Sequence, residues 1–203
     1  MNEAVNVLRL KGVNISEEEQ EQAMVAILLH DVGHGPFSHA LEHNILKGVS
    51  HEEITLALMK AINREKGGRI NMAIDIFTGD YYRKFLHQLV SSQLDVDRLD
   101  YLRRDSFFSG VAEGMIGHER IIKMMNVKDD SLVIEEKGIY SVEKFLISRR
   151  LMYWQVYLHK TVIAAEQLLV EILGRARELK AEGAVIPGSP SLIYFLEKTI
   201  EKS

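Results

Sequence analysis

Apolar residues recur along most of this chain every three or four positions, which is the period of an amphipathic helix. Two capping boxes mark helix starts, one at Ser16 with Glu19 and one at Ser50 with Glu53. Helices are predicted over residues 1–10, 16–30, 50–63, 70–77, 81–92, 95–107, 117–126 and 142–182, and a last amphipathic helix is predicted to reach Lys202.

Two features interrupt the helical pattern. Gly33 and Gly35 break the second helix, and Pro36 suits the first position of a following helix that runs through Leu41. The segments SLVIEE and GIYSV have the composition of short strands, and we expect them to form a hairpin around residues 137–138. The predicted fold class is therefore all-α, a helical bundle with one small β-hairpin.

Length, net charge and composition set the broad class of the protein. A chain of 203 residues can bury one substantial core, so we expect a single domain over residues 1–203. The net charge of -4 gives no strong signal for nucleic-acid binding. The absence of cysteine excludes disulfides, zinc–thiolate sites and thiol catalysis. With no apolar stretch near the roughly 20 residues of a membrane span and no signal peptide, a cytoplasmic location is the default expectation.

The helical pattern is uncapped at Met1 and has no stop signal at Ser203. We therefore expect these residues to be a fragment of a longer chain that continues in both directions.

Chemistry is concentrated in the run AILLHDVGHGPFSH. His30 and Asp31 follow four apolar residues, so we expect the pair to be shielded from solvent. Burying an imidazole beside a carboxylate costs free energy unless another group compensates. A divalent metal ion can do so, because it binds imidazole nitrogen and carboxylate oxygen together.

Two further sets of polar residues recur at helical spacing. Asp97, Tyr101 and Asp105 share one face of the helix predicted over 95–107. The long helix supplies a cationic and aromatic set, which is Arg149, Tyr153, Tyr157 and Lys160. The acidic set taken alone also fits a solvated helix face, because arginines at 98, 103 and 104 interleave it. Taken alone, Arg149 and Lys160 likewise fit the surface of a long helix. Together with the His-Asp pair they suit a site for a metal-bound phosphate and a sugar or ring.

The runs HDVGHGPFSH, SHEE, DVDRLDYLRRD and VYLHK occur in this order between residues 20 and 165. In this they resemble the HD-domain phosphohydrolases and, within that superfamily, the deoxynucleoside triphosphate triphosphohydrolases. The resemblance implies an HD-domain helical bundle. It also implies His30 and Asp31 as paired metal ligands and Asp97 as the distant carboxylate ligand.

The same resemblance assigns the remaining site residues. His34, His39 and His51 fall where the family places catalytic histidines around the scissile phosphate, and His39 is our choice for the acid–base role. Positions that contact the nucleotide correspond to Tyr101, Asp105, Arg149, Tyr157 and Lys160. His43 and His118 match no motif residue, and we interpret both as structural or exposed.

The implied reaction is metal-dependent hydrolysis of a deoxynucleoside triphosphate to nucleoside and triphosphate, in a homo-oligomer. The ion is Fe, Mn, Ni, Zn or Mg by ligand chemistry. One departure stands out, because the family's first metal-binding histidine lies a few dozen residues upstream and no histidine precedes His30 here. A nucleotide-sensing module with little catalysis, or a hydrolase of another nucleotide or a monophosphate, are the alternatives.

Overall fold

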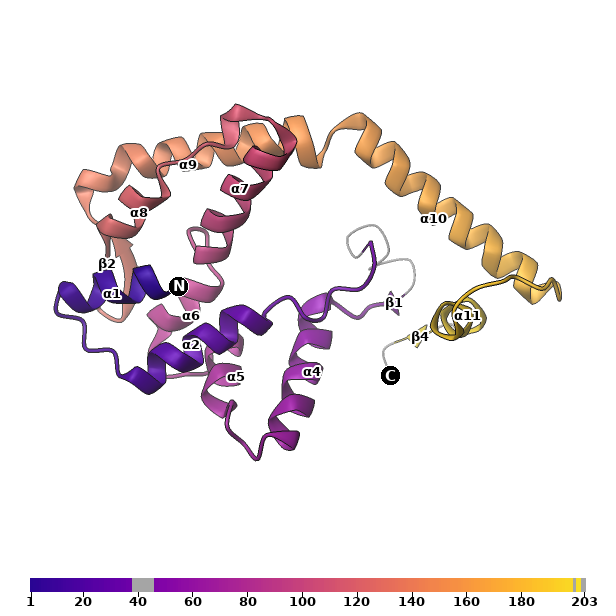
Figure 1. The fold of residues 1–203 in the computed structure, drawn as a ribbon, viewed down its shortest axis with the longest axis horizontal. Helices are drawn as coiled ribbons and strands as arrows, with labels where there is room; N and C mark the ends of the chain where they lie inside the picture. The colour runs from indigo at the N-terminus through magenta and orange to yellow at the C-terminus, as the bar shows by residue number, and fades with distance from the viewer. Residues whose placement is uncertain (38–45, 199, 202–203) are drawn as a thin grey trace.

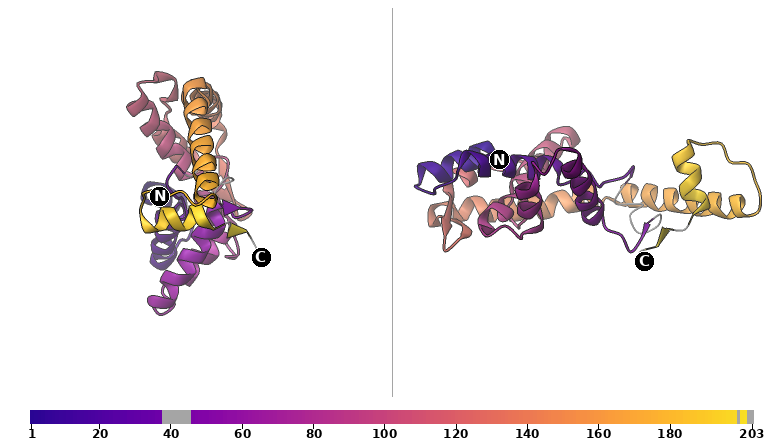
Figure 2. Two further views of the ribbon diagram at one scale, coloured as in Figure 1. Left: turned by 90° about the vertical axis from the view of Figure 1, so that its right-hand side faces the viewer. Right: turned by 90° about the horizontal axis from the view of Figure 1, so that it is seen from below.

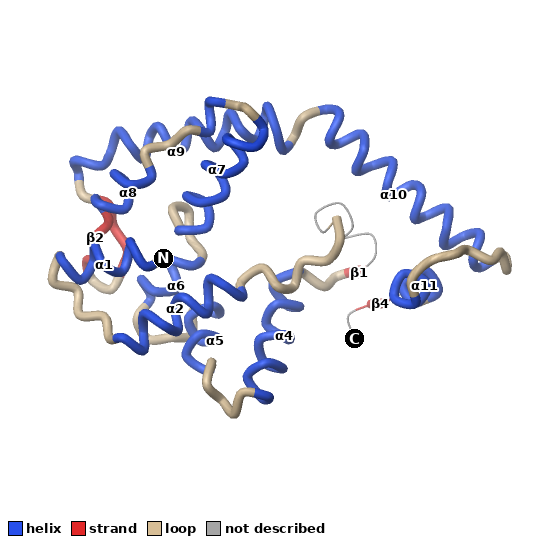
Figure 3. Tube along the Cα trace, viewed as in Figure 1, coloured by secondary structure: helices blue, strands red, loops and turns tan. Residues whose placement is uncertain are grey.

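Helices account for most of the chain in the computed structural model, which describes residues 1–37, 46–198 and 200–201 (Figures 1 and 3). The α-helices in chain order are α1 (Asn2–Leu10), α2 (Glu17–Leu29), α4 (His51–Glu65), α5 (Asn71–Thr78), α6 (Lys84–Val90), α7 (Val96–Ser109), α8 (His118–Met124), α9 (Ile139–Met152), α10 (Lys160–Ala181) and α11 (Pro190–Glu197). Short 3₁₀ turns η1 (Ala112–Gly114) and η2 (Glu136–Gly138) and a π-helical turn η3 (Tyr153–Tyr157) join them. The all-α class is confirmed.

The core lies where α1, α2, α5, α6 and α9 meet. Its fully buried large side chains include Leu8 of α1, Ile76 of α5, Phe85 and Leu89 of α6, and Phe145 of α9. The short helix α6 contributes four buried residues in seven, so it is the central element of the bundle. Burying each such side chain contributes about 1.5–3 kcal/mol.

Both predicted capping boxes form. The Ser16 hydroxyl accepts from the backbone N–H of Glu19, and the Glu19 carboxylate accepts from the N–H of Ser16. Ser50 and Glu53 make the same reciprocal pair at the start of α4. These caps fix the first turns of the two helices whose ends carry the histidines.

The predicted hairpin was wrong in its position. Strand β2 (Met125–Lys128) pairs antiparallel with β3 (Ser131–Ile134), and the turn between them is Asp129–Asp130. Both aspartates have positive φ, 50° and 58°, as a tight two-residue hairpin turn requires. In the segment 138–142, expected as the second strand, Gly138 ends η2 and the other four residues begin α9. A separate pair of two-residue strands, β1 (Leu46–Lys47) and β4 (Ile200–Glu201), is parallel.

The long helix expected over 142–182 is also interrupted. The α-helix ends at Met152, the π-helical turn follows, and α10 starts only at Lys160. From there α10 leads away from the bundle and returns through α11 (Figures 1 and 2). The last helix ends at Glu197 rather than Lys202, because Lys198 adopts extended backbone angles.

The helix predicted to start at Pro36 is not seen at its first two positions. Pro36 and Phe37 lie in a turn, and Phe37 has a φ of 51°, outside the right-handed helical region. The remainder of that predicted helix lies outside the described residues. Among the residues that are described, no helix has both the length and the apolar character that crossing a bilayer requires.

Candidate functional site

The C-terminal end of α2 presents a histidine to two carboxylates. His30 caps α2, and its ring Nδ1 donates to the backbone carbonyl of Ile27 over 2.6 Å. Its Nε2 lies 3.3 Å from Asp31 Oδ2 and 3.6 Å from Asp97 Oδ1. Asp97 comes from the first turn of α7. Two parts of the chain nearly seventy positions apart in sequence therefore meet at one imidazole nitrogen.

The expected shielding from solvent holds for only one member of the pair. The His30 side chain is 21% exposed, whereas that of Asp31 is 53% exposed. The chain turns directly after His30, so the Asp31 carboxylate reaches the wall of an open pocket instead of the core. The Asp97 side chain is 31% exposed at the same pocket.

The carboxylates control the protonation of His30. Burial by itself lowers the pKa of this ring, but the hydrogen bonds to Asp97 and to the Ile27 carbonyl and the charge of Asp31 raise it to about 9. At neutral pH the ring carries a proton that its partners stabilise. A metal ion that binds at Nε2 has to replace that proton, so metal affinity is linked to pH.

A second cluster adjoins the first and shares Asp31. His34 Nε2 lies 3.6 Å from Asp31 Oδ1. The rings of His34 and His51 are stacked, with centroids 4.0 Å apart and planes 16° from parallel. One ligand atom from each of Asp31, His34 and His51 lies within 4.8 Å of the other two. His51 is the first residue of α4, so this helix start lies directly against the turn after α2.

These donors fit a divalent cation. A first-row ion with nitrogen and oxygen ligands at about 2.1 Å holds neighbouring ligand atoms about 3 Å or somewhat more apart. The separations of 3.3 and 3.6 Å around His30 Nε2 are in that range. The Ile27 carbonyl fixes the ring so that Nε2 faces the carboxylates, as in many metal sites. Among the described residues, the three donors whose ligand atoms all lie within 4.8 Å of one another are Asp31, His34 and His51. Metal binding by His30, Asp31 and Asp97 stays a prediction.

The two clusters open into a pocket of about 900 Å³ between α2, α4, α7 and the start of α10. Asp97, Tyr101 and Asp105 line it from one face of α7, as the helical spacing predicts. On the far wall the Tyr157 hydroxyl donates to Asp105 Oδ2 over 2.7 Å. Burial first, and then this carboxylate, raises the pKa of the Tyr157 hydroxyl above its usual range. Tyr157 therefore remains a neutral hydrogen-bond donor.

Two predicted substrate residues lie apart from this pocket lining. The Arg149 guanidinium is 5.2 Å from the centre of the Tyr153 ring, and Lys160 is exposed at the first position of α10. Burial lowers the pKa of Arg149, but hydrogen bonding to Tyr101 outweighs that effect and raises it. The π-helical turn before Lys160 changes the helical register, so the expected common face is not continuous. Ligand contacts at these two positions stay predictions.

The other histidines have mixed outcomes. His39, predicted as the acid–base residue, lies outside the described residues, as does His43. His118 Nε2 is 3.2 Å from an Arg103 guanidinium nitrogen on an exposed surface, which agrees with its interpretation as a residue outside the site.

Sequence analysis missed Thr55 and treated Gly33 only as a helix break, although both residues shape the site. The Thr55 hydroxyl is completely buried and bonds to the turn after α2, and Gly33 lies so close to α4 that no side chain fits. One feature of the sequence could have pointed to Thr55. It follows His51 by four residues, so the two share one face of the predicted helix.

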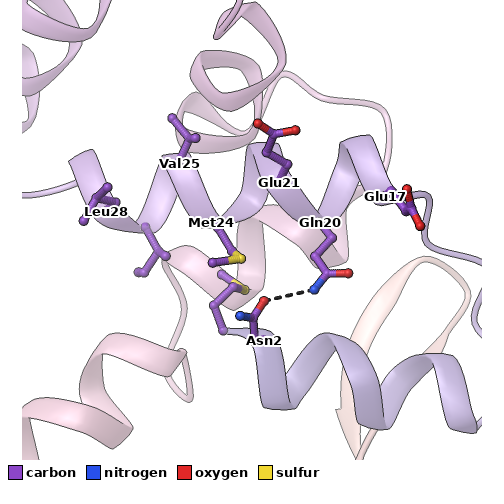
Figure 4. Close-up of a pocket in the computed structure, with 9 residues that line it drawn as sticks. Asn2, Glu17, Gln20, Glu21, Met24, Val25 and Leu28 are labelled. Atoms are coloured by element: carbon purple, nitrogen blue, oxygen red, sulfur yellow. Dashed lines mark hydrogen bonds between the residues drawn. The ribbon is translucent and has the colours of Figure 1, made fainter.

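A second pocket, of about 680 Å³, lies between the N-terminus and α2 (Figure 4). It has the apolar side chains of Met24, Val25 and Leu28 on one wall, and Asn2 accepts from Gln20 across it over 2.9 Å. None of the described residues that line it is a histidine. Its chemistry offers nothing comparable to the donor clusters at His30 and His51.

Comparisons with known proteins show which family the chain belongs to. The chain matches the HD domain model over residues 2–105 and the HD associated region over residues 116–184. It is 58% identical to a phosphohydrolase from Bacteroides thetaiotaomicron of known crystal structure, with a TM-score of 0.96 over 99% of this chain and 50% of that one. It is 37% identical to the uncharacterised protein YwfO of Bacillus subtilis over 89% of this chain and 43% of that protein.

A more distant relative has a named activity. The deoxynucleoside triphosphate triphosphohydrolase SAMHD1 homolog of Dictyostelium discoideum is 28% identical over 81% of this chain and 35% of its own length. The chain thus spans half or less of the length of the relatives it matches here. The HD model covers the turn after α2 and all of α7 up to Asp105, where the histidine and the carboxylates meet, and this chain belongs to the HD-domain family.

Proposed function

We propose that this chain forms the metal-dependent hydrolytic core of a deoxynucleoside triphosphate triphosphohydrolase. The observation that carries the proposal is the convergence of Asp31 and Asp97 on His30 Nε2, beside the stacked rings of His34 and His51. A metal-dependent hydrolase of a polyanionic substrate uses metal ligands beside further hydrogen-bonding groups, and this arrangement offers both.

In this proposal each wall of the pocket has a separate task. His30, Asp31 and Asp97 would hold a divalent ion, which when bound supplies an activated water and offsets phosphoryl charge. His34 and His51 then donate hydrogen bonds to the phosphate oxygens. His39 serves as the acid–base group that returns a proton to the leaving oxygen.

The pocket wall opposite the histidines would bind the sugar and base of the nucleotide. Tyr157 and Asp105 are hydrogen-bonded to each other, and the Tyr101 ring meets the Tyr157 ring edge-on at 6.2 Å. These groups offer a carboxylate acceptor, a hydroxyl and two aromatic surfaces to a sugar and base. Water oxygen joins the α-phosphorus, and the nucleoside leaves with its 5′ oxygen protonated, so the products are nucleoside and triphosphate. The named activity of the Dictyostelium relative supports this substrate class.

A matched set of variants of the full-length protein tests the proposal. Triphosphate release from the four deoxynucleoside triphosphates is measured with Mn²⁺, Fe²⁺, Ni²⁺, Zn²⁺ or Mg²⁺ added. Asp97→Asn should lose both bound metal and turnover, because a ligand is removed. His51→Gln should keep the metal but lose about 100-fold or more in kcat, as expected for loss of a positioned acid, base or donor.

His118→Gln is the control, because His118 lies on the surface beside Arg103 and away from the pocket. Its turnover should match that of the unaltered protein. Full activity of Asp97→Asn would falsify the proposed metal site. The protein could release triphosphate from none of the deoxynucleotides and yet release phosphate from another nucleotide or from a monophosphate. That result would reassign the substrate.

A nucleotide-sensing module that uses the same pocket without catalysis is the alternative function. A sensor predicts nucleotide binding in the full-length protein without any product under every metal condition. Calorimetric titration with a deoxynucleotide, beside the product assay, separates these two functions.

A further inference from the structure

The turn that carries the metal-site residues is tied to α4 by one hydroxyl group. Thr55 Oγ1 accepts from the backbone N–H of Gly33 over 2.9 Å and donates to the backbone carbonyl of His30 over 3.0 Å. Thr55 is completely buried, so both bonds are shielded from water. The two backbone groups lie just beyond the end of α2, where helix termini leave polar groups without helical partners. Thr55 supplies those partners from another helix.

The same helix face that presents Thr55 also presents His51. The two residues are four positions apart in α4, so their side chains lie one above the other. A shift of the Thr55 hydroxyl against the turn therefore moves the His51 ring against Asp31 and His34. The ring stack of 4.0 Å between His34 and His51 depends on this distance between α4 and the turn.

Gly33 makes this close approach sterically feasible. A Cβ atom built on Gly33 would lie 2.1 Å from the backbone carbonyl oxygen of His51 and 2.4 Å from the backbone nitrogen of Thr55. Both contacts are to backbone, which cannot rotate out of the way. The spacing between α4 and the turn after α2 is therefore fixed twice. The Thr55 hydroxyl fixes it from α4, and the missing side chain of Gly33 fixes it from the turn.

We propose that Thr55 is a positioning residue, which sets the His51 ring against Asp31 and His34 by joining the His30 carbonyl to the Gly33 N–H. This proposal rests on the proposed function for its effect on turnover, but its structural part does not. Thr55 touches neither metal nor substrate in this role. It acts through the separation of α4 from the turn after α2.

The test compares Thr55→Val, which keeps the shape and loses the hydroxyl, with Thr55→Ser, which keeps the hydroxyl. Both are made in the full-length protein. Nitrogen-15 NMR of the imidazole rings reports the His34–His51 stack without any need for activity. Thr55→Val should shift both ring signals and lower Mn²⁺ affinity or kcat by about tenfold, while KM changes less. Thr55→Ser should restore the signals and most of the loss.

Thr78→Val is the matched control, because it removes another hydroxyl that bonds to a backbone carbonyl, at the end of α5 and outside the pocket lining. It should leave the ring signals and turnover unchanged. If Thr55→Val does not fold, Gly33→Ala tests the same spacing by steric displacement and should shift the same signals.

Ring signals that stay unchanged in a folded Thr55→Val protein, or a Thr55→Ser protein as impaired as Thr55→Val, would overturn the positioning role. Shifted ring signals in a protein that hydrolyses no nucleotide at all would instead retain the positioning role and reject the proposed function.

Discussion

Glu19 is the residue that most clearly combines two roles, in a helix cap and in an ion pair. Its carboxylate accepts from the Ser16 backbone and from the Arg83 guanidinium at 2.9 and 3.0 Å, and from the Tyr81 hydroxyl at 3.1 Å. Burial alone raises the pKa of Glu19, but these hydrogen bonds, that of Ser16 first, outweigh it and hold the pKa below its usual range. The charged form is therefore stabilised by folding.

We predict that Glu19→Gln lowers the free energy of unfolding by about 3 kcal/mol, because Arg83 loses its charged partner at a largely buried site. Urea denaturation at pH 7 measures this. Because the folded pKa is depressed, the contribution of Glu19 is fully present above the pKa of an unfolded glutamate and is lost as the pH falls through the folded pKa.

The exposed neighbour Glu18 provides the comparison for this prediction. Glu18→Gln should change the free energy of unfolding by less than about 0.5 kcal/mol. If the Gln variant at 19 lost no more stability than the one at 18, the Glu19 network would be unimportant.

At the level of single residues, sequence reasoning identified the donors but not their support. His30, Asp31 and Asp97 were selected by residue type, by the glycine after α2 and by resemblance, and the structure brings both carboxylates within 3.6 Å of His30 Nε2. The exposure of Asp31 was not foreseen, because it depends on where the turn faces. Thr55 has an ordinary residue type in an ordinary helix, and only tertiary contacts reveal its bonds.

Among the elements, α4 has the site residue His51 at its first position. Its N-cap Ser50 accepts from the N–H of Glu53, and the next residue is His51. We predict that Ser50→Ala lowers the free energy of unfolding by about 1 kcal/mol, whereas Ser50→Gly costs only a few tenths. The difference arises because glycine leaves the helix end accessible to water.

Thermal and urea unfolding of the two variants measures this order. Ser189→Ala removes the N-cap bond of the remote helix α11 and serves as the control for site effects. It should leave Mn²⁺ affinity unchanged, whereas Ser50→Ala should weaken it. Equal Mn²⁺ affinities for the two alanine variants would contradict a link between this cap and the site.

Helices whose starts are marked by a capping motif in the sequence were predicted well. The hairpin and the π-helical turn, whose exact positions no local motif marks, were not. The two capping boxes located α2 and α4 because the cap hydrogen bonds are made within four residues. The hairpin was misplaced because β-branched residues occur in both 131–134 and 139–142, while the Asp129–Asp130 turn carries no glycine. The π-helical turn was missed because apolar spacing continues through it with little change.

At the scale of the whole molecule, α10 differs from every other long helix that the structure describes. None of its 22 residues is buried, although Val162, Leu168 and Ile172 are apolar. Helices with few buried contacts open at low free energy. We predict that amides of α10 in the 203-residue chain exchange at least about 100-fold faster than those of α2 and α5.

Hydrogen exchange followed by mass spectrometry checks this prediction at several protein concentrations. Protection of α10 that rises with concentration would support the homo-oligomer expected from the sequence, which stays a prediction here. Protection equal to that of α5 at the lowest concentration would show that α10 is stable without further contacts.

The π-helical turn at Tyr153–Tyr157 has a consequence for how this chain tolerates changes in length. The Leu158 N–H bonds five residues back to the Tyr153 carbonyl over 2.7 Å, so one more residue is wound into this turn than an α-helix holds. Deleting a residue here would swing Tyr157 by about 100° away from Asp105. Related chains should therefore carry their insertions and deletions in the loop at 182–189, and keep a constant residue count between Met152 and Lys160.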